Sequence, residues 1–386
     1  MTRLLDVKDL AVTFGEGVGA TEAVRGVSFH VDKGETVALV GESGSGKSVS
    51  ALSVMQLLPY PLAHHPSGTI AFKGEPLVGA PKGRMRALRG EDISMVFQEP
   101  LTSLNPLHPI GRQIAEAITT HHARSKEDVY ARVVELMKLV GLDAQIERLG
   151  SLPHEFSGGQ QQRIMTAMAL ANEPDLLIAD EPTTAVDVTV QAQILKLLSD
   201  LQAKMGLGIL FITHDLGIVR RIANRAYVMQ GGEIVEHGPT QTLFAYPKHP
   251  YTQALLAAEP KGAPPPAPAA SPKLLTATDV KVWFPIKRGF LRRTVDHVKA
   301  VDGVDLIVQK GHTLGIVGES GSGKSTLARA LLRLERAEGS VIFKDHDVLN
   351  ISNRAVQTLR REMQIVFQDP FGSLSPRMSV AGIVGE

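Results

Sequence analysis

The sequence predicts an α/β fold with a mostly parallel core sheet, present as one complete copy and one partial second copy. Two observations predict this fold class. A loop of eight residues, rich in glycine and serine, follows an apolar strand and precedes a helical segment, and the whole arrangement occurs twice. The strands that precede these loops are apolar without interruption, which is typical of parallel strands that helices cover on both faces.

The first predicted elements surround the glycine-rich loop. We expect Thr36–Val40 to form the strand and Val49–Leu58 to form a helix, which ends at the following proline because proline cannot continue it. In the second copy we expect a strand over residues 313–317 and a helix over residues 326–334. Both loops therefore lie between a strand and a helix.

The repeat defines the domain organisation. Gly41–Ser48 recurs as Gly318–Ser325, and Val96–Pro100 recurs as Val366–Pro370 with one conservative change. A repeat of this length indicates a duplicated domain. The segment between the copies is dominated by proline and alanine, so we expect a semi-rigid extended tether. The predicted divisions are a first domain over residues 1–259, a linker over residues 260–273, and the N-terminal part of a second domain over residues 274–386.

The composition excludes several classes of protein. Apolar residues make up 43% and charged residues 21%, which is typical of a globular chain, and a net charge of +1 gives no reason to expect nucleic acid as a partner. The absence of cysteine excludes disulfides and thiolate metal sites. We find no signal peptide and no run of 18 apolar residues, so we expect any link to a membrane to run through a partner.

The repeated loop has the pattern that binds phosphates. Glycines let the backbone approach a phosphate closely, and successive N–H groups at a helix N-terminus favour an anion. Lys47 would contact the β- and γ-phosphates of ATP, and Ser48 would offer its hydroxyl to Mg²⁺. The residues predicted to bind nucleotide are Gly41, Glu42, Ser43, Gly44, Ser45, Gly46, Lys47 and Ser48 in the first copy, and Gly318, Glu319, Ser320, Gly321, Ser322, Gly323, Lys324, Ser325 and Thr326 in the second.

Two carboxylates follow another apolar strand. Asp180 and Glu181 end the strand that begins at Asp175, and the carboxyl edge of a parallel sheet is where the phosphate loop also lies. We predict that Asp180 binds Mg²⁺ and that Glu181 acts as general base toward the attacking water. The alternative is an ordinary acidic pair solvated at a turn, which the neighbouring phosphate loop disfavours.

The remaining motifs carry a resemblance to a known family. Ser157-Gly-Gly-Gln160 precedes apolar residues at helical spacing, so it begins a helix and forms a second anion-binding N-terminus. The order of the phosphate loop, Gln98, this motif, Asp180–Glu181 and His214 resembles the ABC ATPases over nearly the whole chain. The resemblance implies a P-loop NTPase fold with an added antiparallel β subdomain and a helical subdomain.

The resemblance also implies roles for single residues. Phe14 and Phe284 would stack on adenine, Gln98 would contact Mg²⁺ and the catalytic water, and His214 would contact the γ-phosphate. Taken alone, Phe14 would more often be a core residue and His214 a structural one, and the ordered set of motifs favours the functional roles. In the second copy, Ser325 and Gln368 would be the metal contacts. Two residues depart from the family pattern: Phe156 replaces a leucine before the signature serine, and Val49 replaces the threonine that the second copy has as Thr326.

In the family, two nucleotide-binding domains meet head to tail, and each ATP lies between the phosphate loop of one and the Ser157–Gln160 type motif of the other. The partner would be the second copy in a fused protein, or another first copy in a homodimer. The second copy stops at Glu386, level with Glu116 of the first. We therefore expect the sequence to be a truncated part of a longer fused protein, and expect this chain alone to bind Mg-ATP but turn it over slowly.

Two segments point to one transporter subfamily. His249–Leu256 and Pro100–Pro106 resemble the ATPases of dipeptide and oligopeptide importers, whose fused forms serve microcin C-like peptide or glutathione uptake. This resemblance implies separate membrane permease subunits, an indirect substrate-binding protein, and a peripheral location on the cytoplasmic face of the plasma (inner) membrane. The alternative is a permease-free ABC ATPase acting on the ribosome or DNA; the linker, the charge and the lack of cysteine argue against it.

Overall fold

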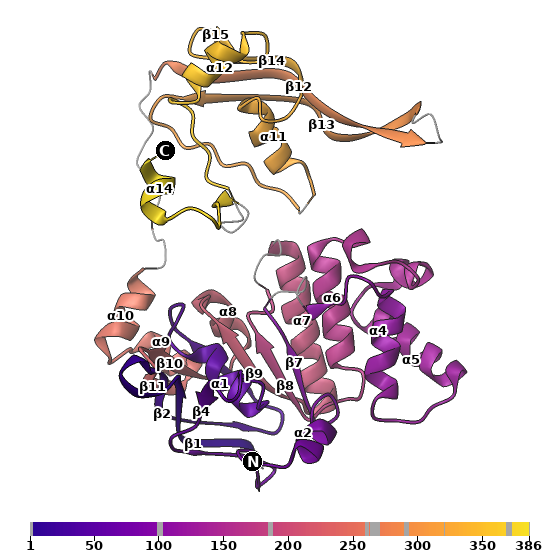
Figure 1. Cartoon of the computed structure of the whole chain (residues 1–386), viewed down its shortest axis with the longest axis vertical. Helices are drawn as coiled ribbons and strands as arrows, with labels where there is room; N and C mark the ends of the chain where they lie inside the picture. Colours follow the sequence, from indigo (N-terminus) through magenta and orange to yellow (C-terminus); the bar gives the residue numbers. More distant parts are fainter. Residues whose placement is uncertain are drawn as a thin grey trace. The chain divides into compact units, whose positions relative to one another are not determined.

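The computed structural model describes residues 3–98, 103–183, 188–258, 262, 271–288, 293–319, 321–367 and 373–385. The chain divides into two compact units, Met1–Gly262 and Ala263–Glu386 (Figure 1). Most of the predicted linker lies outside the described residues. Within the described ranges, no helix has the length and apolar character needed to cross a membrane.

The first unit contains two sheets. An antiparallel sheet has the order β2-β1-β5-β6, with β4 beside β1. A second sheet has the order β11-β10-β3-β9-β8-β7, in which only β11 runs antiparallel to its neighbour. The strands of the first sheet are β1 (Arg3–Phe14), β2 (Thr21–Asp32), β4 (Ala63–His64), β5 (Thr69–Phe72) and β6 (Glu75–Pro76); those of the second are β3 (Thr36–Val40), β7 (Ile93–Val96), β8 (Leu176–Asp180), β9 (Gly208–Thr213), β10 (Arg225–Gln230) and β11 (Glu233–Pro239).

Every residue of β3, β8 and β9 is buried, which confirms the predicted parallel strands. In Figure 1, α4, α5 and α6 lie together at one side of this unit and the antiparallel strands lie at the other. The helices are α1 (Lys47–Val54), α2 (Lys82–Leu88), α4 (Ile110–Thr119), α5 (Lys126–Leu139), α6 (Gly158–Ala169), α7 (Val188–Met205), α8 (Leu216–Ile222), α9 (Thr240–Ala245) and α10 (Pro250–Ala257), with short 3₁₀ turns at Gly17–Gly19, Asp143–Arg148 and Pro153–Glu155.

Two large apolar cores and one smaller cluster, which includes Val40 and Leu256, hold this unit together. One lies between the antiparallel sheet and the parallel sheet and includes Leu5, Phe29 and Leu39. The other lies among the helices and the opposite face of the parallel sheet and includes Ile114 and Ile164. Because both faces of the parallel sheet are covered, its strand ends form a fixed edge on which polar side chains can be placed.

The helix after the phosphate loop is shorter than predicted. It ends at Val54 instead of Leu58, because Gln56 has a φ of 47° and this left-handed backbone cannot continue a right-handed helix. In the second copy the helix ends at Leu331 instead of residue 334, and Arg333 there has a φ of 50°. In the first copy Pro59 sets an outer limit for the helix, and the chain leaves the helix before that limit; in both copies a left-handed residue follows the last helical turn.

The second unit is built on a long hairpin. Its sheet has the order β13-β12-β14-β15. Its elements are β12 (Lys273–Arg288), β13 (Arg293–Gln309), β14 (Glu338–Phe343), β15 (His346–Asp347), α11 (Lys324–Leu331), α12 (Asn353–Leu359) and α14 (Val380–Gly385).

The strand predicted over residues 313–317 is wrong for this structure. In the first unit the matching strand β3 is hydrogen-bonded to β9 on one side and to β10 on the other. In the described part of the second unit no strand pairs with residues 313–317, and Val317 is 92% exposed. A strand needs a neighbour to satisfy its backbone groups, so apolar character alone does not form one.

Candidate nucleotide site

The phosphate loop joins the carboxyl end of β3 to the start of α1. Gly41, Gly44 and Gly46 have φ values of 149°, 80° and 97°. A Cβ added to Gly41 would lie 2.2 Å from the carbonyl oxygen of Met229, and one added to Gly46 would lie 2.6 Å from that of Ala23. Glycine is therefore required at both positions by the chain itself, before any ligand is considered.

Lys47 reaches back over this loop. Its Nζ donates to the carbonyl oxygens of Gly41 at 2.8 Å and Glu42 at 2.7 Å, and to Ser45 Oγ at 3.3 Å. Burial lowers the pKa of Lys47, and the nearby carboxylates, Glu181 among them, act in the opposite direction. Each of these hydrogen-bond partners is a neutral oxygen, so the charge of the ammonium remains available to an anion in the loop.

Ser48 and Asp180 meet beside the loop. Asp180 is the last residue of β8, is 6% exposed, and its Oδ1 accepts a hydrogen bond from Ser48 Oγ at 3.0 Å. Burial raises the pKa of Asp180, and the hydrogen bond from Ser48 acts to lower it. A hydroxyl and a carboxylate are hard oxygen ligands of the kind Mg²⁺ takes together with substrate phosphates, so the donor set fits that ion.

Glu181 is held between the other two predicted catalytic residues. Its Oε2 accepts a hydrogen bond from Gln98 Nε2 at 3.1 Å, and its Oε1 lies 3.1 Å from His214 Nδ1. Its φ is 45°, and its N–H donates to the carbonyl of Ile212 on β9. A non-glycine residue in the left-handed region is strained, and such strain concentrates at functional sites. The ends of β7, β8 and β9 thus bring Gln98, Glu181 and His214 together. The order of these residues in the sequence could not establish that they are in contact.

The Ser157–Gln160 motif precedes a different helix from the phosphate loop. It begins α6 with a reciprocal capping pair, in which Ser157 Oγ accepts from Gln160 N at 3.4 Å and Gln160 Oε1 accepts from Ser157 N at 3.0 Å. Ser157 and Gly158 are exposed, whereas Gly159 is buried against Val190. Among the described residues, no hydrogen bond joins this motif to the phosphate loop. An exposed cap with free N–H groups can serve a ligand held mainly by another domain.

The aromatic residues predicted for adenine differ in exposure. Phe14 ends β1, is half-buried and packs against the first core, whereas Phe284 is 40% exposed. Phe156, which replaces the family leucine, is buried with the guanidinium of Arg148 over its ring at 4.7 Å. Val49 packs partly buried against the first core.

The second phosphate loop repeats the geometry of the first. Gly318, Gly321 and Gly323 have φ values of 158°, 80° and 89°. Lys324 Nζ donates to the carbonyl oxygens of Gly318 at 2.7 Å and Glu319 at 2.6 Å, and to Ser322 Oγ at 3.4 Å. Ser325 and Thr326 follow on α11. Ser320 and Gln368 lie outside the described residues.

One contact at the first loop was not predicted from the sequence. The backbone N–H of Glu42 donates to the hydroxyl of Tyr251 at 3.0 Å. Tyr251 belongs to the His249–Leu256 segment. In the sequence this segment indicated only a resemblance to one transporter subfamily. No local pattern links positions 209 residues apart.

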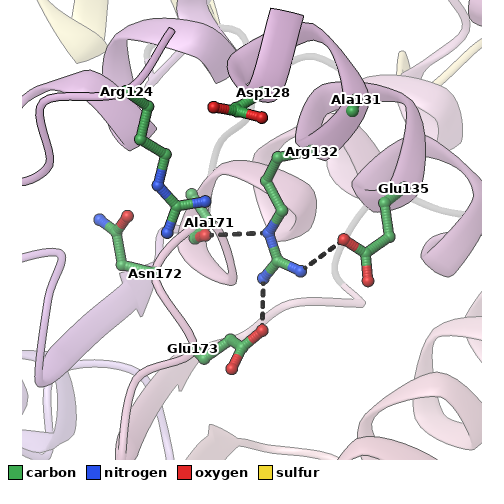
Figure 2. Close-up of a pocket in the computed structure, with 8 residues that line it drawn as sticks. All are labelled: Arg124, Asp128, Ala131, Arg132, Glu135, Ala171, Asn172 and Glu173. Atoms are coloured by element: carbon green, nitrogen blue, oxygen red, sulfur yellow. Dashed lines mark hydrogen bonds and ion pairs between the residues drawn. The ribbon is translucent and has the colours of Figure 1, made fainter.

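A separate cavity of about 580 Å³ lies beside α5 and the turn after α6 (Figure 2). Arg132 donates there to the carbonyl of Ala171 and pairs with Glu135 at 2.8 Å and Glu173 at 3.1 Å. Its guanidinium is thus already matched by two carboxylates. The lining includes no residue of either phosphate loop, so this cavity is not the candidate nucleotide site.

Comparison with known proteins decides the family. The model of the ABC transporter family matches residues 24–184 and 301–382. The chain belongs to the ABC transporter family. A relative named peptidoglycan transport ATP-binding protein YejF, from Agrobacterium fabrum, is 56% identical over 99% of this chain and 70% of its own length. The glutathione import ATP-binding protein GsiA of Pectobacterium atrosepticum is 43% identical over 98% of this chain and 66% of its own length.

Solved structures agree with the ABC assignment. An ATP-binding cassette solved as a dimer in a post-hydrolysis state, with ADP and Pi bound, matches with a TM-score of 0.56 and 27% identity. The match covers 61% of this chain and 99% of that cassette. The predicted P-loop fold is confirmed, and the chain is an ATP-binding, ATP-hydrolysing ABC protein of the importer type.

Proposed function

We propose that this ABC ATPase powers the import of peptides or peptide-like compounds through separate membrane permease subunits. The names of the relatives support this substrate class, because peptidoglycan and glutathione both contain peptide bonds. The proposed place of action is the cytoplasmic face of the plasma membrane, where the chain would bind as a peripheral protein. A substrate-binding protein would act on the other side through the permease.

The observation that carries the proposed chemistry is the position of Glu181 between Gln98 and His214. Lys47 and the loop N–H groups would bind the phosphates, and Ser48 and Asp180 would hold Mg²⁺, which supplies charge neutralisation when bound. Glu181 would take a proton from water as the water oxygen attacks the γ-phosphorus and the bond to ADP breaks.

The contact between His214 and Glu181 suggests how the base is released. His214 is 62% exposed at its side chain, whereas Glu181 is 15% exposed. An arriving γ-phosphate would compete for the imidazole with this carboxylate. Moving His214 to the phosphate would take the imidazole away from Oε1 of Glu181, the oxygen that would then face the attacking water. Gln98 would keep its hydrogen bond to the other carboxylate oxygen, Oε2, and help to orient the carboxylate.

Two partners complete the proposal. A second nucleotide-binding domain would place its own motif of the Ser157–Gln160 type over the first phosphate loop. In support, the Ser157 cap of this domain is exposed and, among the described residues, forms no hydrogen bond with the phosphate loop of the same domain. The permease would dock in a groove of about 530 Å³ next to Gln98, lined by Met95, Phe97 and Met168 among others. Methionines adapt to an inserted helix, and an apolar groove is a common receptor for one.

The test of the chemistry is Glu181→Gln, with Glu173→Gln as the matched control. Both glutamates have a left-handed backbone, with φ values of 45° and 56°, so the two substitutions perturb the chain alike. Loss of a general base lowers turnover by about 10²–10⁴-fold. We expect Glu181→Gln to keep ATP binding and lose turnover, and Glu173→Gln to keep both. Equal turnover in the two variants would refute the role of Glu181.

The transport proposal needs a separate test in cells. Deleting the gene and restoring it with either the native sequence or Glu181→Gln should separate uptake from expression. Radiolabelled glutathione, a tripeptide and a peptidoglycan fragment would serve as probes. Uptake of at least one should require the native sequence. Unchanged uptake of all three in the deletion strain would overturn the peptide-import proposal without affecting the ATPase assignment.

A further inference from the structure

The segment His249–Leu256 places a tyrosine hydroxyl on the phosphate loop. α10 begins at Pro250, and His249 caps it by accepting a hydrogen bond at Nδ1 from Tyr251 N at 3.2 Å. The hydroxyl of Tyr251 then accepts from Glu42 N at 3.0 Å. Glu42 is the second residue of the loop, so this contact reaches the loop at its start.

The position of Tyr251 is set independently of the loop. The carboxylate of Glu236 on β11 accepts hydrogen bonds from Lys248 N at 2.8 Å and from His249 N at 3.0 Å. The Tyr251 ring is half-buried against an apolar cluster that includes Val40, the last residue of β3. The core and the tail segment therefore fix the hydroxyl, and the loop meets it there.

The backbone of Glu42 is consequently held at both of its peptide groups. Tyr251 accepts from its N–H, while Lys47 Nζ donates to its carbonyl at 2.7 Å. In the second unit, Lys324 makes the matching bond to Glu319 at 2.6 Å, yet among the described residues of that unit no side-chain hydroxyl accepts from Glu319 N. Among the described residues, the second loop thus forms without a hydroxyl partner for this N–H, and Tyr251 gives the first loop one additional restraint.

We propose that Tyr251 is a positioning residue for the phosphate loop, through which the tail helix α10 sets the affinity of the first site for ATP. This inference rests on the proposed assignment of Gly41–Ser48 as the phosphate site. The restrained Glu42 N–H shares its planar peptide group with the carbonyl of Gly41, which accepts from Lys47 Nζ at 2.8 Å, so less order has to be gained when the nucleotide binds. Restraint of this kind improves affinity without new contacts to the ligand.

The test is Tyr251→Phe, which keeps the ring and removes the hydroxyl. Tyr246→Phe is the matched control, because Tyr246 lies in the same tail and is 76% exposed. Both changes are made in a Lys324→Ala background so that binding reports the first loop. We expect the Kd and KM for ATP to rise about 3- to 10-fold, the range that one net hydrogen bond supplies. The kcat should stay the same, because the loop is held alike in ground and transition states.

Hydrogen exchange gives a readout that simple packing would not change. The Glu42 amide should exchange faster in Tyr251→Phe, with the melting temperature and the exchange of α10 unaltered. Exchange and Kd equal to those of the control would overturn the inference, and so would a lower melting temperature with unchanged Kd. Lys47→Ala separates this result from the proposed site: if that variant binds ATP normally, the phosphate-site assignment itself fails.

Discussion

Replacing two glycines of the phosphate loop by alanine, one at a time, should affect stability and ATP binding differently. Gly44 and Gly46 have similar left-handed φ values, 80° and 97°. A Cβ on Gly44 would meet nothing within 4 Å, whereas one on Gly46 would lie 2.6 Å from the carbonyl oxygen of Ala23 and 3.3 Å from a methyl of Val24. The backbone penalty is therefore shared by the two variants, and the steric penalty belongs to Gly46→Ala alone.

The magnitudes follow from these distances. A left-handed alanine costs about 1–2 kcal/mol, offset by about 0.4–1 kcal/mol from a stiffer unfolded chain. Overpacking against fixed backbone at Gly46 adds about 1–3 kcal/mol. At the midpoints of these ranges Gly44→Ala loses about 0.8 kcal/mol and Gly46→Ala about 2.8 kcal/mol. Since 1 kcal/mol shifts the melting temperature by about 2–4 °C in a unit of this size, Gly44→Ala should melt about 2–3 °C lower and Gly46→Ala about 6–11 °C lower.

Binding should rank the two positions differently from stability. The open space at Gly44 is where the proposed phosphates would lie, so a methyl group there should weaken ATP binding by more than about 10-fold even though the fold tolerates it. Fluorescent ATP titration in a Lys324→Ala background measures this effect. Far-UV circular dichroism follows unfolding, and Trp283, the single tryptophan, reports the second unit as an internal control. The reasoning is refuted if Gly44→Ala melts as low as Gly46→Ala, or binds ATP like the native chain.

Two further substitutions test the charge and the packing of the site. Because burial raises the pKa of Asp180 above its ordinary value of 3.8, the folded state disfavours its charge. Asp180→Asn should therefore raise the melting temperature at neutral pH while removing hydrolysis. This gain in melting temperature should vanish as the pH falls through the raised pKa of Asp180. Thermal melts of both proteins from pH 7 to pH 4 check this, and a difference in melting temperature that stays constant over that range would contradict it. Val49→Thr should tighten ATP binding about 2- to 5-fold by adding a hydroxyl contact to phosphate. The free energy of unfolding should fall by about 1 kcal/mol, because a methyl group is lost from the core. An unchanged Kd in the ATP titration would show that the hydroxyl does not reach the phosphate.

The sequence predicted the parts of the fold that depend on neighbouring residues. The phosphate loop, the buried strands before it and before Asp180, and the helix that Ser157 begins all follow from local composition and capping, and the structure has them. It could not predict that residues 313–317 would lack strand structure, because pairing depends on other strands. The contact of Tyr251 with Glu42 was also beyond it, since the two positions share no local pattern.

The two loops show which part of the chemistry is encoded locally. In the second unit no strand pairs with residues 313–317 among those described, yet its loop has nearly the same φ values as the first, and Lys324 makes the same three contacts as Lys47. The shape of the phosphate loop is therefore a property of its own eight residues and the helix that follows them.

The arrangement around Glu181 has a different origin. It requires β7, β8 and β9 in register, because its three members follow three separate strands and the N–H of Glu181 bonds to Ile212. The phosphate loop can therefore form without the sheet edge that places the residues for ATP hydrolysis. Changes that loosen the sheet edge should reduce turnover while sparing nucleotide binding, whereas changes within the loop should remove both.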